Sequence, residues 1–98
     1  MAASEPTRVR LAASLDLKAA GPLLGELKAA RGADLAVEAA DVRRLGGQCL
    51  QVLLAAHAAW QGDGQAFAIE GASPAFVEGA ALMGAADLLG VSNLELAP

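Results

Sequence analysis

The 98-residue sequence contains few of the residues from which active sites are built. It has one cysteine, Cys49, one histidine, His57, and no tyrosine. A single cysteine excludes an internal disulfide and a cysteine-rich zinc site, because both need several thiols. A nucleophilic cysteine needs a nearby base, and His57 lies two helical turns further along the predicted helix. We therefore expect a protein that is not an enzyme and binds no metal or cofactor. Cys49 is then a small core residue and His57 a structural one.

Positive charge and long apolar segments are also scarce. Seven Lys and Arg residues against eleven Asp and Glu give a formal net charge of -4. This charge does not suit binding to a nucleic-acid backbone. The longest apolar run covers only residues 52–56, against the roughly 18 consecutive apolar residues of a membrane helix. The first ten residues lack the apolar core of a signal peptide. The sequence predicts a cytoplasmic protein that neither binds nucleic acid nor inserts into a membrane.

Alanine is the most abundant residue in the sequence. Hydrophobic residues make up 55% of the chain, 25 of its residues are alanine, and aromatic residues are only 3%. A chain of this length forms one domain, with a thin and closely packed core. We expect a domain over residues 8–90, preceded by a flexible segment 1–7 and followed by a tail 91–98.

Strand and helix patterns alternate along this domain. Alternating polar and apolar residues predict the strands, and helical spacing with end signals predicts the helices. The segments 14–16 and 41–45 are expected to be a turn and a connector. In chain order the six predicted elements are strand 8–12, helix 18–31, strand 34–39, helix 47–61, strand 66–70 and helix 74–83. This order predicts an α/β fold in which about three helices cover a mostly parallel sheet.

The helices differ in how their apolar residues are distributed. The first is expected to bury one face, and the third to bury an apolar side that starts after the N-cap Ser73. The second helix is apolar on more than one face, so it is either buried on most sides or offers a face to a partner. The residues expected to be buried are Ala20, Leu23, Leu24, Leu27 and Ala30 in the first helix, and Phe76, Val77, Ala80 and Met83 in the third.

A pair of glycines, Gly46 and Gly47, begins the second helix. Backbone amides at such a place can hold an anion, but neither a Walker sequence nor a dinucleotide-binding sequence is present. We interpret the pair as a tight turn. The carboxylates are scattered, and the one close pair beside a connector, Glu38 and Asp41, is interpreted as solvated surface charge.

Four segments together resemble the STAS domain of anti-sigma factor antagonists and sulfate transporter tails. They are Leu15-Asp16-Leu17, the strand 35–38, the run 42–56 and Ser73-Pro74-Ala75. The most specific is the segment 50–56, which is similar to the second helix of that family, and the resemblance covers residues 8–90. It implies a single-domain STAS-like α/β fold that works by binding proteins.

The resemblance also implies a difference in regulation. STAS domains commonly carry Asp-Ser or Asp-Thr before the second helix, and a partner kinase phosphorylates that hydroxyl to switch binding off. Gly46 and Gly47 stand there in this sequence, whereas Glu38 matches the acidic residue that ends the preceding strand. The docking surface is expected to remain without the phosphoryl switch.

The run 44–54 is similar to small single-domain STAS proteins of bacterial chemotaxis systems. Those proteins associate with the chemotaxis histidine kinase and affect dephosphorylation of the response regulator. The leading hypothesis is therefore a bacterial signalling module that binds such a kinase. Two alternatives are a degenerate anti-sigma factor antagonist, with an anti-sigma-type kinase as partner, and an accessory subunit of a lipid-transport ATPase. A third is a small-ligand enzyme or carrier, for which the sequence shows no site.

The expected contact residues lie at the start of the second helix. Unpaired amides give that end a positive field, so an acidic partner helix suits it. A plain solvated edge is the alternative interpretation. The six candidate partner-binding residues are Arg43, Arg44, Gly46, Gly47, Gln48 and Gln51.

Overall fold

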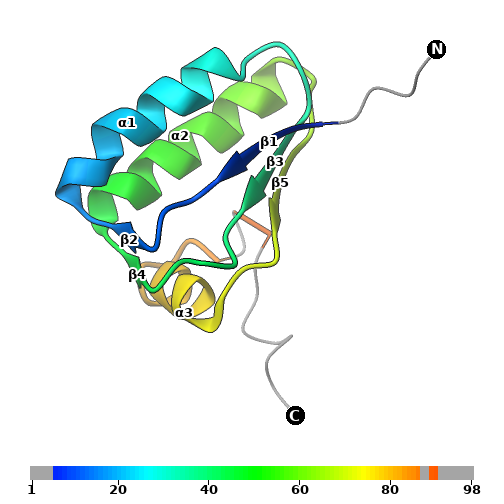
Figure 1. Ribbon diagram of the computed structural model, residues 1–98. Helices are drawn as coiled ribbons and strands as arrows, with labels where there is room; N and C mark the ends of the chain where they lie inside the picture. Colours follow the sequence, from blue (N-terminus) through cyan, green and yellow to red (C-terminus); the bar gives the residue numbers. More distant parts are fainter. Residues whose placement is uncertain (1–5, 87–88, 91–98) are drawn as a thin grey trace.

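Three parallel strands form the centre of the fold (Figure 1). The structure is a computed structural model that describes residues 6–86 and 89–90. Its elements in chain order are β1 (Thr7–Arg10), β2 (Ser14–Leu15), α1 (Leu17–Ala29), β3 (Leu35–Glu38), β4 (Arg44–Leu45), α2 (Gly47–Gly62), β5 (Phe67–Glu70) and α3 (Pro74–Leu82). β3 lies between β1 and β5, and both pairings are parallel. The predicted α/β class, with a parallel sheet and three helices, is confirmed.

Two short strands, β2 and β4, were not predicted from the sequence. They pair with each other in parallel, with Ser14 opposite Arg44 and Leu15 opposite Leu45. The sequence predicts only a turn over 14–16 and a connector over 41–45, because two residues are too few to show a period-two pattern. The backbone amides of Arg43 and Arg44 both donate to the Ala13 carbonyl, at 2.7 and 3.2 Å. β2 and β4 therefore resume, after a gap, the pairing that β1 and β3 begin.

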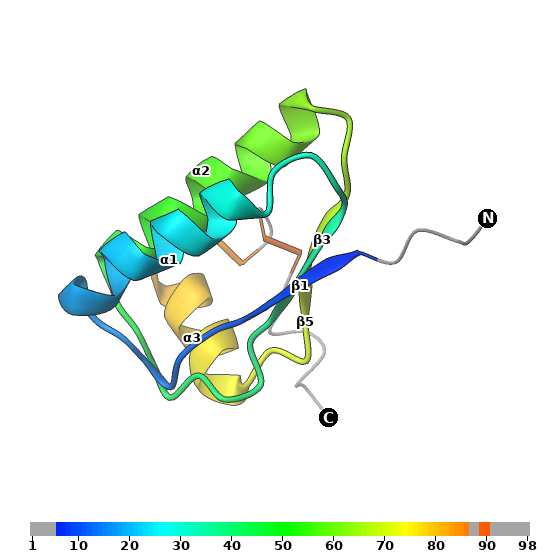
Figure 2. The same ribbon diagram turned by 45° about the horizontal axis from the view of Figure 1, so that its top comes forward.

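Helices α1 and α2 lie side by side over one face of the sheet (Figures 1 and 2). Their buried side chains fall on one stripe of each helix. These are Leu23 and Leu27 in α1, and Cys49, Leu50, Leu53, Ala56 and Trp60 in α2. They pack over Val9, Leu35 and Val37 of the strands in one apolar core. No helix among the described residues is long and apolar enough to cross a membrane.

Two predictions of buried side chains were wrong. Leu24 is 42% exposed, because adjacent residues in a helix point about 100° apart and Leu23 takes the core position. Met83 is equally exposed, since α3 ends at Leu82 and Met83 occupies the C-cap beyond the last helical turn. The other predicted positions of α3, Phe76, Val77 and Ala80, are buried.

Ion pairs cross the face of the sheet that points away from α1 and α2. The Arg8 guanidinium of β1 reaches over β3 to Glu70 of β5 at 2.8 Å, and also contacts Glu38 at 3.2 Å. Its hydrogen bond to Glu70 is the main reason that the pKa of Arg8 is raised above its ordinary value. Arg10 lies 3.6 Å from the same Glu38 carboxylate. Glu38 is therefore a member of a cross-strand network, and not simply a solvated charge near a connector.

Helix α3 packs against β4, away from the other two helices (Figure 1). Ser73 caps it as predicted: its hydroxyl accepts from the Phe76 amide at 3.1 Å and donates to the Val42 carbonyl at 2.6 Å. At the amino end, β1 begins at Thr7, inside the segment 1–7 that was predicted to be flexible. The expected tail 91–98 lies outside the described residues.

Candidate partner-binding site

The beginnings of α1 and α2 lie next to each other because β2 and β4 pair directly before them. The Gly46 amide donates to the Leu15 carbonyl at 2.8 Å. One turn on, the Cys49 thiol donates to the Asp16 carbonyl at 3.3 Å. The six predicted contact residues occupy the segment 43–51 at this place. We call them the α2 edge: Arg43, Arg44, Gly46, Gly47, Gln48 and Gln51.

The two glycines of the α2 edge differ in how much space surrounds them. A Cβ atom on Gly46 would lie 2.8 Å from the Leu15 carbonyl oxygen, closer than real contacts of this kind allow. A Cβ atom on Gly47 would have no heavy atom within 4 Å, apart from its immediate chain neighbours and helix backbone. Gly46 has an extended backbone (φ -88°, ψ 162°), so the predicted tight turn is not what requires glycine there; the close approach to Leu15 is, whereas position 47 has room for a side chain.

The electrostatics of this helix end are mixed. Gly46 is the N-cap and has no side chain to accept from the first-turn amides, and no acidic residue stands in that turn. Such an end favours a negative partner group. The Asp16 side chain, which caps α1 by accepting from the Ala19 amide at 3.1 Å, already supplies one negative charge nearby. Burial raises the pKa of the Cys49 thiol, and the Asp16 charge raises it further. Cys49 is thus a buried, protonated core residue, as predicted.

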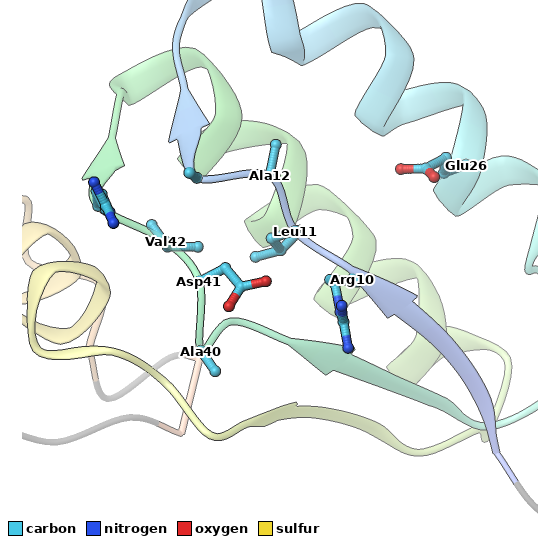
Figure 3. Close-up of a pocket in the computed structure, with 9 residues that line it drawn as sticks. Arg10, Leu11, Ala12, Glu26, Ala40, Asp41 and Val42 are labelled. Carbon is cyan, nitrogen blue, oxygen red and sulfur yellow. The ribbon is translucent and has the colours of Figure 1, made fainter.

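The two adjacent arginines of the α2 edge, Arg43 and Arg44, differ in their position relative to a neighbouring hollow. Both are exposed. Arg43 lines a hollow of about 700 Å³ that opens where β1 and β3 diverge, and Arg44 does not line it (Figure 3). Arg43 therefore borders this hollow, whereas Arg44 is exposed outside its lining.

The hollow itself has charged walls of both signs. Arg10 and Asp41 stand on its two strand sides and Glu26 reaches toward it from α1 (Figure 3). Its lining has no histidine, cysteine or hydroxyl side chain. No group of three or more His, Cys, Asp or Glu side chains within residues 6–86 and 89–90 is arranged to hold a metal ion. This arrangement can bind charged groups of either sign.

The helical part of the α2 edge consists of two exposed glutamines. A further exposed residue, Leu17, was not predicted from the sequence. Gln48 and Gln51 are exposed and lie three residues apart, so they share one side of α2. Leu17, the first residue of α1, is 72% exposed. The sequence signal that could have found it is its place directly after Asp16, a residue type that favours the N-cap of a helix. His57 lies further along α2, with its ring edge-on to Phe67 at 5.5 Å, which fits a structural role.

We expect Gly46→Ala and Gly47→Ala to have different effects on stability. The first forces a Cβ atom against the Leu15 carbonyl and should lower the free energy of unfolding by about 1–3 kcal/mol. The second adds helix propensity in open space and should leave stability unchanged or raise it by up to about 1 kcal/mol. Urea denaturation followed by circular dichroism measures both. Equal destabilisation by the two substitutions would contradict the close approach at Gly46.

The chain matches one family model over residues 1–90, nearly its whole length, and the description of that family is "Mlab, STAS domain". No curated protein and no solved structure matches the chain. Domains of this kind are generally non-enzymatic, and they mediate protein–protein interaction or act in the manner of anti-sigma antagonists. The match confirms the family to which the sequence resemblance pointed.

Proposed function

The chain belongs to the STAS-domain family, and from this premise we propose that it is a bacterial signalling module that docks on a histidine kinase of the chemotaxis type. Docking takes place through the α2 edge and modulates dephosphorylation of the response regulator. The module performs no chemistry of its own in this proposal. Its binding is not switched by phosphorylation at the start of α2.

The observation that carries the proposal is the close contact of Gly46 with Leu15. It holds the α2 edge in a fixed shape, with the first-turn amides of α2 beside the start of α1. No residue from 46 to 51 has a hydroxyl group. The place where the family carries a phosphoryl switch thus has a close backbone contact in this protein and lacks the hydroxyl group that is phosphorylated. This combination favours a constitutive docking surface.

Charge and hydrogen bonding at the α2 edge suit an acidic helix of the partner. Arg44 and Arg43 form no ion pair with any described residue, so their guanidinium groups are available to carboxylates. Gln48 and Gln51 can each donate and accept hydrogen bonds. Leu17 adds apolar surface at the same place. A partner helix with carboxylates on one side satisfies these groups together.

A second candidate function is that of an accessory subunit of a lipid-transport ATPase. The observation that favours it is the name of the matching family, which is Mlab and not that of the anti-sigma antagonists. The degenerate anti-sigma antagonist is the weakest of the three, because Gly47 has no oxygen to phosphorylate. Capture of partners from a lysate of the native bacterium, with mass-spectrometric identification, separates a histidine kinase from a transport ATPase and from an anti-sigma factor.

We predict that Arg43→Glu with Arg44→Glu weakens binding to the captured kinase by about tenfold or more, since two attractive contacts become repulsive. Wild-type affinity should also fall as salt is added, because exposed charges are screened over about 8–10 Å near physiological ionic strength. Isothermal titration calorimetry at two salt concentrations measures both effects. Stability should change by only about 0.5 kcal/mol, as is usual for exposed positions.

The matched control is Arg43→Lys with Arg44→Lys, which keeps both charges and should keep most of the affinity. The single variants Arg43→Glu and Arg44→Glu then show which side of the backbone faces the partner. Unchanged affinity of a folded double-glutamate variant would remove both arginines from the interface.

Phosphorylation provides an independent prediction. Incubation of the wild-type protein with the captured kinase and labelled ATP should leave no stable phosphate on the segment 46–51, which has no hydroxyl side chain. Gly47→Ser fits the open space at that position and should become labelled only by an anti-sigma-type kinase. Mass spectrometry of the proteolysed protein reads out both results. A wild-type phosphopeptide covering residues 46–51 would refute the proposal of an unswitched edge.

A further inference from the structure

An apolar groove runs between α1 and α2 above core residues, and no residue of the α2 edge lines it. It contains a hollow of about 190 Å³. Leu24 and Lys28 form its wall on α1, and Val52, Ala55 and Ala59 form its wall on α2. We call these five residues the α1–α2 groove. The two helices lie side by side in both views of the structure (Figures 1 and 2).

The exposed leucines of α1 follow this groove. Leu24, 42% exposed, lies in the groove wall, and Leu17 stands seven residues before it, on the same side of the helix two turns away. Gly21 lies between them on that side and offers no side chain. Single exposed leucines are ordinary on protein surfaces. Leu24 lies opposite the alanines of the neighbouring helix, and Leu17 extends the exposed apolar side of α1 beyond the groove, which is the kind of surface that receives another helix.

The charged side chains that line the α1–α2 groove are positive, and one of the two is already paired. The 16 residues of α2 include no Asp, Glu, Lys or Arg. The charged residues that line the hollow are Lys28 and Arg31. Arg31 is held by Asp63 at 2.8 Å and lies over the Trp60 ring at 5.5 Å. Lys28 makes no ion pair with any residue in the described part of the chain. An occupant with carboxylates therefore fits this end of the groove.

We propose that the α1–α2 groove binds an amphipathic helix of a partner protein, with its apolar side on Leu24 and the alanines and its carboxylates near Lys28. A second copy of this chain is a poorer occupant, because the lining that it would present has no carboxylate. The proposal goes beyond the docking of a kinase on the α2 edge and does not depend on it.

The dimensions suit the contact face of about two turns of a partner helix. From Leu24 to Arg31 the groove follows α1 for about 10 Å, at about 1.5 Å per residue. The alanine side chains of α2 are short, so a partner helix can approach to the roughly 8–10 Å at which packed helices lie.

The test uses two synthetic helix-forming peptides and the full-length protein labelled with nitrogen-15. Both peptides have leucines at helical spacing, and glutamates flank the stripe in one where lysines flank it in the other. We expect the glutamate peptide to shift amide signals over residues 24–31 and 52–60, with affinity about fivefold or more above that of the lysine peptide. Shifts confined to other parts of the protein, or equal affinity of both peptides, would overturn the proposal.

Two alanines of α2 provide a matched pair of variants. Ala55 lies in the groove and Ala58 is exposed outside its lining. Ala55→Glu should weaken binding of the glutamate peptide by about tenfold or more, by adding bulk and like charge, and Ala58→Glu should leave binding unchanged. Equal binding by both variants, each shown to be folded by its amide spectrum, would refute the proposal. Self-association in sedimentation velocity that Ala55→Glu abolishes would identify a second copy as the occupant and overturn it too.

Discussion

The parallel pairing of β2 with β4, closed by the hydrogen bond from the Gly46 amide to the Leu15 carbonyl, determines how this molecule presents its surface. It brings the first residues of α1 and α2 together and sends both helices in the same direction over the sheet (Figure 1). The approach is close enough that a side chain at position 46 has no room. Both the α2 edge and the α1–α2 groove exist because these two helices start side by side.

The composition of α2 suits a helix that binds partners without performing chemistry. Its buried stripe, from Cys49 to Trp60, contributes to the core, while alanine and glutamine occupy its outer sides. The one thiol is buried, and its surroundings raise its pKa, so it is held in the protonated form. The charged hollow beside Arg43 has ion-pairing groups and no thiol, hydroxyl or imidazole side chain. Our proposal assigns this end of the fold to contacts with another protein, which is consistent with the family to which the chain belongs.

Helices of several turns and strands with several alternating residues could be predicted from the sequence. Two-residue strands and individual side-chain contacts could not. The three main strands and all three helices were predicted, because Val9, Val37 and Ile69 alternate with outward residues and the helices carry clear apolar spacing. β2 and β4 have two residues each and leave no pattern. The ion pairs of Glu38 depend on strand register, which sequence alone does not show. Leu24 was assigned to the core because it keeps helical spacing with Ala20 and Leu27, and only packing shows that Leu23 takes the core position instead.

Hydrogen–deuterium exchange of the full-length protein, with and without its captured kinase, tests the central claim most directly. The first-turn amides of α2 have no intrahelical acceptor, so they should exchange rapidly in the free protein. The account predicts that kinase binding slows exchange in peptides covering residues 43–51 and leaves peptides covering β5 unchanged. Slowed exchange confined to β1 and β5, with residues 43–51 unaffected, would place the partner on the ion-paired face of the sheet and contradict the assignment of the α2 edge.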